Sequence, residues 1–186
     1  MTSRQSRWLV VSGLVLGLAA RPAVAQVGAA PATHFEAGAQ YTLFHFEGDG
    51  TNHGIAGWVG YMLDPSIGFE AEVGWLPSGD GDLTEALFGV KLGDRRGRFG
   101  SYFKLRPGFV RLEVPVVCPA IYPPPPGCEV GGTRSDTRFA VDVGGIFEFL
   151  TSDKTLLRFD LGNTFVHVHD YWTNNFQLAA GFGVRF

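Results

Sequence analysis

IGFEAEVGW, residues 67–75, alternates apolar residues with small or acidic ones at every step. Side chains two residues apart lie on the same face of a β-strand. The stretch therefore predicts a strand with one large apolar face and one small, charged face. The two faces carry Ile67, Phe69, Ala71, Val73 and Trp75 on one side and Gly68, Glu70, Glu72 and Gly74 on the other.

The same alternation recurs along the chain in segments separated by two kinds of connection. Long connections alternate with short ones, DPS, DRRGR and TSDK, whose Asp, Ser and Gly residues favour tight turns. This order is typical of an up-and-down antiparallel meander, which we expect to close into an eight-stranded barrel. The predicted strands are His34–Phe46, Ile55–Leu63, Ile67–Leu76, Glu85–Gly93, Phe99–Leu112, Thr137–Leu150, Thr155–Val168 and Phe176–Phe186.

The charged residues decide which face of the strands points outward. A water-facing exterior of Phe, Trp and Leu is unfavourable, and the narrow interior of an eight-stranded barrel suits small and charged side chains. Facing the mid-strand charges toward lipid would cost roughly 16 kcal/mol at ~2 kcal/mol each, against about 5–15 kcal/mol of stability for a typical domain. We therefore predict an all-β transmembrane barrel with a polar, salt-bridged interior. The predicted interior charge network is Glu70, Glu72, Lys91, Lys104, Arg106, Asp142, Arg158 and Asp160.

The interior charges nearly balance, which indicates a plugged lumen rather than an open channel. Glu70 and Glu72 are expected to form salt bridges with Lys91 or Lys104 on neighbouring strands. Acid–base chemistry by these paired carboxylates is the alternative interpretation. The full set of inward charges is Glu36, Glu70, Glu72, Glu85, Asp142, Glu148 and Asp160 against Lys91, Lys104, Arg106, Arg138, Arg158 and Arg185.

Two polar residues fall on the lipid-facing side of the alternation. Arg111 lies close to a loop, so its long side chain can reach the membrane interface. Asn163 lies in the middle of a predicted strand, and for it we predict a β-bulge at Gly162.

The first 25 residues have the pattern of a secretory signal peptide. Arg4 and Arg7 precede an apolar run of 13 residues, and Ala23-Val24-Ala25 supplies the small-x-small cleavage pattern. The run is shorter than the roughly 20 residues of a membrane-spanning helix. We expect a cleaved leader at 1–25, a short lead at 26–33 and the barrel at 34–186. Losing three leader arginines takes the net charge from −3 to −6, which argues against nucleic acid as a partner.

The cysteines Cys118 and Cys128 lie in CPAIYPPPPGC. An even cysteine count in an exported chain favours a loop-closing disulfide, and two free thiols are the alternative. The spacing is not that of a metal site. The four consecutive prolines, 123–126, favour a stiff extended segment.

The last residues, LAAGFGVRF (178–186), continue the alternation up to Phe186. A barrel must pair its last strand with its first, so we expect this strand to close the barrel. With the leader and the eight alternating segments, residues 34–186 resemble the small outer-membrane β-barrels of Gram-negative bacteria, which include the OmpA membrane domain and the opacity-type surface proteins. In that family the terminal aromatic strand is read by the outer-membrane assembly machinery. The resemblance gives this role to Leu178, Ala180, Phe182, Val184 and Phe186.

The resemblance also implies a location and a topology. We expect a monomer in the bacterial outer membrane, surrounded by outer-membrane lipid, with both termini and the short turns in the periplasm. The long 113–136 stretch would then lie at the cell surface, as a stapled loop or as a partner-binding tip. The expected function is a structural or surface-exposed, non-enzymatic role without a cofactor or metal, in which the loops contact partners.

Two other functions stay open on the sequence alone. One is an outer-leaflet lipid-modifying enzyme of the lipid A deacylase type, and the other is a soluble periplasmic carrier of the lipocalin type. The deacylase would carry a His-x-Ser-Asn run, whereas this chain has His167-Val168-His169-Asp170 without a serine. These histidines could hold a metal with Asp170, or they could join Tyr171 in an interfacial belt.

Overall fold

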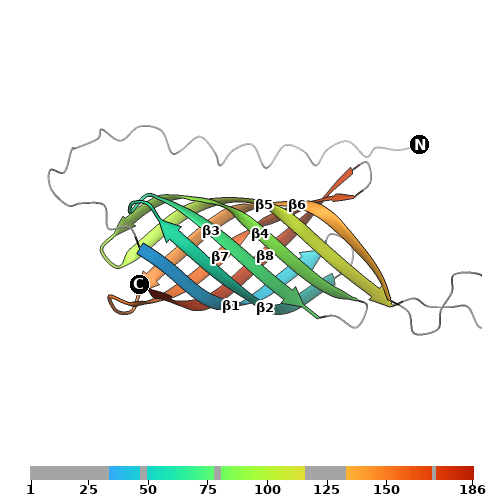
Figure 1. Cartoon of the computed structure of the whole chain (residues 1–186), viewed down its shortest axis with the longest axis horizontal. Helices are drawn as coiled ribbons and strands as arrows, with labels where there is room; N and C mark the ends of the chain where they lie inside the picture. Colours follow the sequence, from blue (N-terminus) through green and yellow to red (C-terminus); the bar gives the residue numbers. More distant parts are fainter. Residues whose placement is uncertain (1–33, 47–49, 78–80, 116–132, 169–170) are drawn as a thin grey trace, which may run out of the picture. The chain divides into compact units, whose positions relative to one another are not determined.

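The computed structural model describes residues 34–46, 50–77, 81–115, 133–168 and 171–186. They form a closed barrel of eight antiparallel strands in chain order, tilted across the barrel (Figure 1). The predicted up-and-down barrel is thereby confirmed. The strands are β1 (His34–Phe46), β2 (Gly50–Met62), β3 (Ile67–Leu76), β4 (Asp82–Arg96), β5 (Phe99–Pro115), β6 (Thr133–Leu150), β7 (Thr155–Val168) and β8 (Tyr171–Arg185).

Several strands are longer than predicted, mainly at the ends that join the long connections. The first hairpin pairs Phe46 with Gly50, so β2 begins five residues before the predicted Ile55. β8 begins at Tyr171 and not at Phe176. Backbone pairing requires only amide and carbonyl groups, so it continues where the side chains no longer alternate between apolar and polar. The predicted long connections were therefore too long.

The short connections are tight turns held by local hydrogen bonds. Between β2 and β3, Asp64 Oδ1 accepts hydrogen bonds from the backbone amides of Ser66 at 2.7 Å and Ile67 at 2.9 Å. Between β4 and β5, Gly97 has a φ of 59°, a backbone conformation that favours glycine. These turns explain why the alternation stops at DPS and at Gly97-Arg98.

The last strand pairs with the first and closes the barrel. β1 and β8 are in register from Glu36 and Arg185 to His45 and Phe176. Beyond this ladder, the amide of Phe186 donates a hydrogen bond to the carbonyl of Phe35 at 2.9 Å. Closure gives every strand two neighbours, so no sheet edge is left to pair with another chain.

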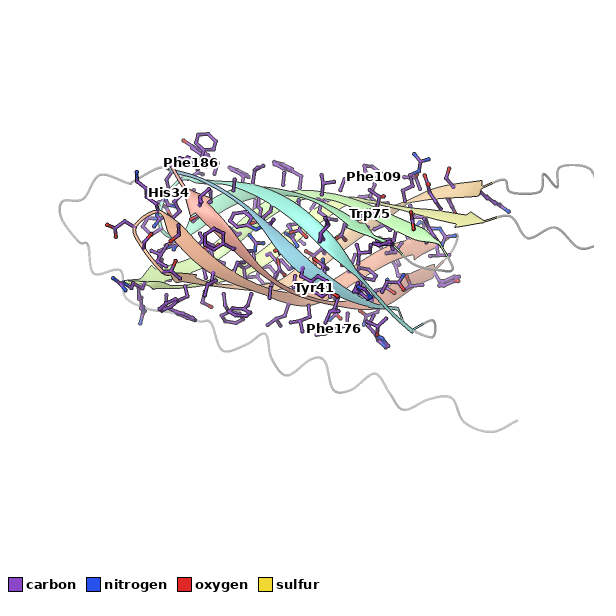
Figure 2. All side chains as sticks on the ribbon, turned by 90° about the horizontal axis from the view of Figure 1, so that it is seen from below. His34, Tyr41, Trp75, Phe109, Phe176 and Phe186 are labelled. Carbon is purple, nitrogen blue, oxygen red and sulfur yellow. The ribbon has the colours of Figure 1, made fainter. Side chains whose placement is uncertain are left out.

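The outer surface of the barrel is apolar and aromatic. Large apolar side chains project outward from it, among them Trp75, Phe109 and Phe176 (Figure 2). Neighbouring rings also contact one another, as between Phe109 and Phe139 (6.0 Å between centroids) and between Phe139 and Trp172 (6.2 Å). A surface of this kind requires apolar surroundings. A soluble carrier, whose apolar faces would line a cavity, is therefore wrong.

Among the described residues, no helix has the length and hydrophobicity needed to cross a membrane.

The two outward polar residues have different explanations. Arg111 is exposed and forms a salt bridge with Glu113 at 2.7 Å. The bulge predicted at Gly162 is wrong, because the register runs without interruption through Gly162 on both sides of β7. Asn163 is a half-buried, outward residue of a regular strand, and nothing in the structure explains its polarity.

Apolar side chains fill part of the interior. The largest cluster lies at the end of the barrel that carries the long connections, and its members are Phe44, Leu76, Leu83, Val110, Ala140, Val166 and Val168. Toward the other end the indole of Trp58 lies across Gly38 and Gly183, where a Cβ would approach the ring to 2.8 and 2.7 Å. Only glycine leaves room for the ring at these two positions.

We predict that an arginine at Leu161 destabilises the barrel strongly. Leu161 is in the middle of β7 and 41% exposed on the outer surface, so Leu161→Arg would place a charge in the lipid core at a cost of about 2–4 kcal/mol. The measurement is the free energy of unfolding by denaturant titration in lipid vesicles.

His167→Arg is the matched control, because it puts the same side chain on the same face at the end of β7. We expect it to cost only about 0–1 kcal/mol. Equal effects of the two substitutions would contradict a membrane-embedded middle of the barrel.

Candidate functional site

The candidate site is the lumen, and Arg106 of β5 lies in its centre. Its Nη1 donates hydrogen bonds to Glu70 at 2.7 Å and Glu72 at 2.6 Å, and its Nε donates to Asp142 at 2.7 Å. Its Nη2 lies 3.5 Å from Asp160. One planar guanidinium with five N–H donors can serve carboxylates from several strands at once.

Arg158 of β7 is the second guanidinium of this centre. It contacts Glu70 through both of its terminal nitrogens, with Nη2 to Oε1 at 2.7 Å, and it donates to Asp160 at 3.0 Å. Its guanidinium also lies 4.5 Å from the ring of Trp58, which is a cation–π contact. The bidentate pairing and the indole together hold Arg158 in one orientation.

Lys104 of β5 completes the centre by forming salt bridges with Asp142 at 2.7 Å and with Asp160. All the side chains in the group are shielded from solvent, with exposed fractions of 0–1%. The structure therefore brings together seven of the eight residues of the predicted network. This central cluster is Glu70, Glu72, Lys104, Arg106, Asp142, Arg158 and Asp160.

Lys91, the eighth predicted residue, belongs to a second cluster near the short-turn end. Its Nζ lies 2.7 Å from Glu36 and 2.8 Å from Glu148. Arg95 bridges the same two carboxylates and also donates to the hydroxyl of Tyr102 at 3.2 Å. Arg95 belongs to β4 and not to the predicted DRRGR turn. The inward alternation of Lys91 and Gly93 continues to Arg95 and is the sequence signal for its position.

The predicted partners of Glu70 and Glu72 are wrong. Neither carboxylate forms a salt bridge with Lys91 or Lys104 among the described residues, and both are paired with Arg106 and Arg158. In so narrow a lumen, long side chains reach across the barrel as easily as along the wall. Sequence neighbours and adjacent strands therefore do not determine the pairing.

A layer of polar residues joins the central cluster to the apolar end. Gln40 donates to Glu72 at 3.0 Å, Gln177 donates to Glu85 at 3.2 Å, and Thr164 donates to Gln177 at 3.3 Å. These side chains come from β1, β8, β4 and β7 and are all buried. Gln40, Thr164 and Gln177 are not among the predicted interior residues, because uncharged polar side chains give a weaker inward signal than charged ones.

One group of acidic residues has the geometry of a metal site. The carboxylates of Glu70, Glu72 and Asp160 offer oxygen atoms within 4.8 Å of one another, as no other three potential ligands do among the described residues. Arg106 and Arg158 already donate hydrogen bonds to these oxygens. The two guanidinium charges therefore stand where a metal ion would lie.

The carboxylates considered for acid–base chemistry are buried and already hydrogen-bonded. Glu70 and Glu72 are each 1% exposed, and their oxygens are held by arginines or by Gln40. A general acid or base has to reach a proton of the substrate, whereas the arginines that pair with Glu70 and Glu72 occupy their oxygens. The arrangement holds charges inside the barrel and fills it.

The other predicted residues lie elsewhere. His167 is exposed on the outer surface, with its ring 5.0 Å from that of Trp172, while His169, Asp170, Cys118 and Cys128 lie outside the described residues, as do the predicted leader and lead. The proposed assembly-signal residues all face outward on the closing strand or directly after it: Leu178, Ala180, Phe182, Val184 and Phe186.

We predict that Arg106→Met destabilises the barrel severely. The substitution removes the cation that Glu70, Glu72 and Asp142 share, and breaking a buried ion pair from one side costs about 3–5 kcal/mol. Denaturant titration followed by tryptophan fluorescence measures the loss. Arg111→Met, which removes an exposed partner of Glu113, is the control and should cost less than about 1 kcal/mol. A loss at Arg106 as small as at Arg111 would contradict the central role of this guanidinium.

Comparison with known proteins identifies the family. The family model described as outer membrane protein beta-barrel domain matches residues 11–186. No curated protein matches the chain in sequence. Solved structures resemble its fold at low identity, so the likeness to them concerns the fold alone.

The attachment invasion locus protein Ail of Yersinia pestis is 14% identical with a TM-score of 0.54, over 83% of this chain and 97% of that one. Neisserial surface protein A is 14% identical with a TM-score of 0.56, over 82% and 95%. The N-terminal β-barrel domain of Pseudomonas aeruginosa OprF is 12% identical with a TM-score of 0.52, over 83% and 99%. Because the family model covers most of the chain, this protein belongs to the outer membrane β-barrel family and is a protein of the bacterial outer membrane.

Proposed function

We propose that the protein is a closed, non-enzymatic barrel that anchors its long connections at the outer face of the outer membrane. It acts as a structural or surface-exposed scaffold, and its loops contact partners. The observation that carries this proposal is the filled lumen, in which Lys104, Arg106, Asp142, Arg158 and Asp160 are each 0% exposed.

The interior is blocked in layers. The central cluster crosses the lumen from β3 to β7 through Arg106 and Arg158. Toward the long connections it is followed by the apolar cluster around Phe44, Leu83 and Val110. An open pore needs a continuous path of water, whereas paired charges and packed apolar side chains exclude water. This favours a scaffold over a channel.

The outward histidine favours a role at the membrane interface over catalysis. His167 packs near Trp172, and Trp172 contacts Phe139 on the next strand but one. Aromatic residues of this kind form the girdles where barrels meet lipid headgroups. The sequence around His167 also lacks the serine of the deacylase run, so we propose that the chain has no lipid-modifying activity.

The outer surface of the barrel is proposed to contact two partners. Outer-membrane lipid covers the apolar belt, since large side chains such as Val73 and Phe88 are about 60% exposed on it. The outer-membrane assembly machinery recognises the outward residues of β8 during biogenesis, in keeping with the family resemblance. Because β1 and β8 already pair, the folded barrel is proposed to be a monomer.

We predict that the full mature chain does not conduct ions. In planar lipid bilayers it should give no stable conductance steps, because the salt-bridged centre leaves no water path. A known porin, inserted in the same bilayers, is the positive control. Stable steps that scale with salt concentration would overturn the closed scaffold and indicate a channel.

The enzymatic alternative is tested separately by mass spectrometry of lipid A. Cells that express the protein, cells that express His167→Ala and cells without it should all show the same acylation pattern. A change that appears with the protein and disappears with His167→Ala would establish the lipid-modifying enzyme and contradict the proposed function.

A further inference from the structure

Glu85 differs from every other buried carboxylate of the described chain. Glu85 lies on β4, faces the lumen and is 0% exposed. The six other buried carboxylates each form at least one salt bridge with Lys or Arg, whereas Glu85 forms none among the described residues. Its Oε1 accepts a hydrogen bond from Gln177 at 3.2 Å, and its Oε2 has no hydrogen-bond partner there.

The charges around Glu85 do not balance. The central cluster contains four carboxylates and three cations, and Glu85 raises the number of carboxylates to five. Ionised carboxylates that lack a positive partner are very unfavourable where they are shielded from bulk water. Two further positive charges would neutralise this part of the lumen, and either protons or a bound cation can supply them.

Within the part of the chain that the structure describes, two buried side-chain oxygens of β1 also lack a hydrogen-bond partner. The Nε2 of Gln40 donates to Glu72, and the Oε1 of the same amide, which is bonded to the same carbon, has no partner. The hydroxyl oxygen of Thr42, two residues further along the same face of β1, has none either. Gln40 is 3% and Thr42 0% exposed, so bulk water does not satisfy these oxygens.

The strand register places Glu85 in the same row as Gln40, through Ala56 on β2 and Gly74 on β3. Glu85 pairs with Gly74 in the β3–β4 register, and a Cβ on Gly74 would lie 2.7 Å from Glu85 Oε1. The side chain therefore folds over Gly74, on the face of β3 that also carries Glu72. Because Gly74 has no side chain, nothing on β3 separates the two carboxylates.

We propose that one hard divalent cation, calcium or magnesium, binds in the lumen between Glu85, Glu72 and the amide oxygen of Gln40. All these donors are oxygens, which calcium and magnesium prefer, and none is the nitrogen or sulfur that softer metals take. The two charges of the ion match the two that the cluster lacks. Arg106 holds Oε2 of Glu72 at 2.6 Å, so the ion contacts the other oxygen, Oε1, which lies next to Gln40. Arg158 holds Glu70 and Asp160 and keeps the ion away from them.

The site is enclosed by the apolar end of the lumen. Glu85 is flanked on its own strand face by Leu83 and Leu87, and its register partner on β5 is the buried Val110. An ion held behind these side chains exchanges slowly with solvent. It is therefore captured as the barrel folds and stays bound when free metal is removed.

The test is refolding of the full mature chain into detergent with calcium, with magnesium or with EDTA, followed by desalting. Mass spectrometry of the elements measures the retained metal, and the temperature at which the band shifts in SDS gels measures stability. The wild type should retain one equivalent of calcium or magnesium and unfold at a higher temperature than after refolding in EDTA.

Glu85→Gln is the key variant. The new side-chain amide still accepts the hydrogen bond from Gln177, so the barrel should fold. The variant should retain no metal, and its unfolding temperature should be the same after refolding with calcium, magnesium or EDTA. Glu113→Gln, at an exposed ion pair with Arg111, is the matched control and should retain metal like the wild type. If Glu85→Gln does not fold, Gln40→Met tests the same site, because it removes only the amide ligand and should reduce metal retention.

Two results would overturn the proposal. One is a wild-type barrel that retains neither ion and unfolds at the same temperature in all three refolding conditions. The other is metal retention that is unchanged in Glu85→Gln, or in Gln40→Met where that variant is needed, which would assign the ion to another part of the chain.

Discussion

The interior of the barrel depends on the ion pairs of Arg106. Its guanidinium contacts Glu70, Glu72 and Asp142, carboxylates that come from two different strands. Without a shared cation between them, these carboxylates would repel one another in a site without water. Since a closed barrel has no free edge at which to relax, this repulsion would act on the whole ring of strands.

The membrane and the narrow lumen together require that charged side chains point inward and pair with one another. Because successive side chains of a strand point to opposite faces, every second residue points into the lumen. Lipid excludes charges from the outer surface, so the charged residues lie at the inward positions, where they must pair with one another. Small residues make this packing feasible, as where Trp58 lies across Gly38 and Gly183. The result is a barrel whose interior is filled by paired charges and apolar side chains, which stabilise the fold.

Much of the fold could be predicted, because a period of two is a local property. The alternation at residues 67–75 placed β3 and the inward carboxylates Glu70 and Glu72 correctly. The predicted strand ends were less accurate where the alternation of side chains stops before the backbone pairing does, as at the start of β2 at Gly50. Arg95 was not predicted as an interior residue because Arg, Asp and Gly together are typical of a solvent-exposed turn. The inward alternation of β4 nevertheless continues from Lys91 to Arg95. The bulge expected at Gly162 does not occur, since a polar outward residue is compatible with a regular strand.

The sequence alone is sufficient to establish the inward and outward faces of each strand and the need for lipid, because these follow from the alternation within a strand. The number of strands follows from how often that alternation recurs along the chain. The sequence could not establish which charges pair. Partners such as Arg158 and Glu70 are 88 residues apart and meet only because the closed barrel places β3 and β7 on opposite walls of one narrow lumen. That no Lys or Arg of the described strands pairs with Glu85 is likewise a property of the assembled interior. The sequence contains nearly equal numbers of inward positive and negative charges, but it does not show where each one lies.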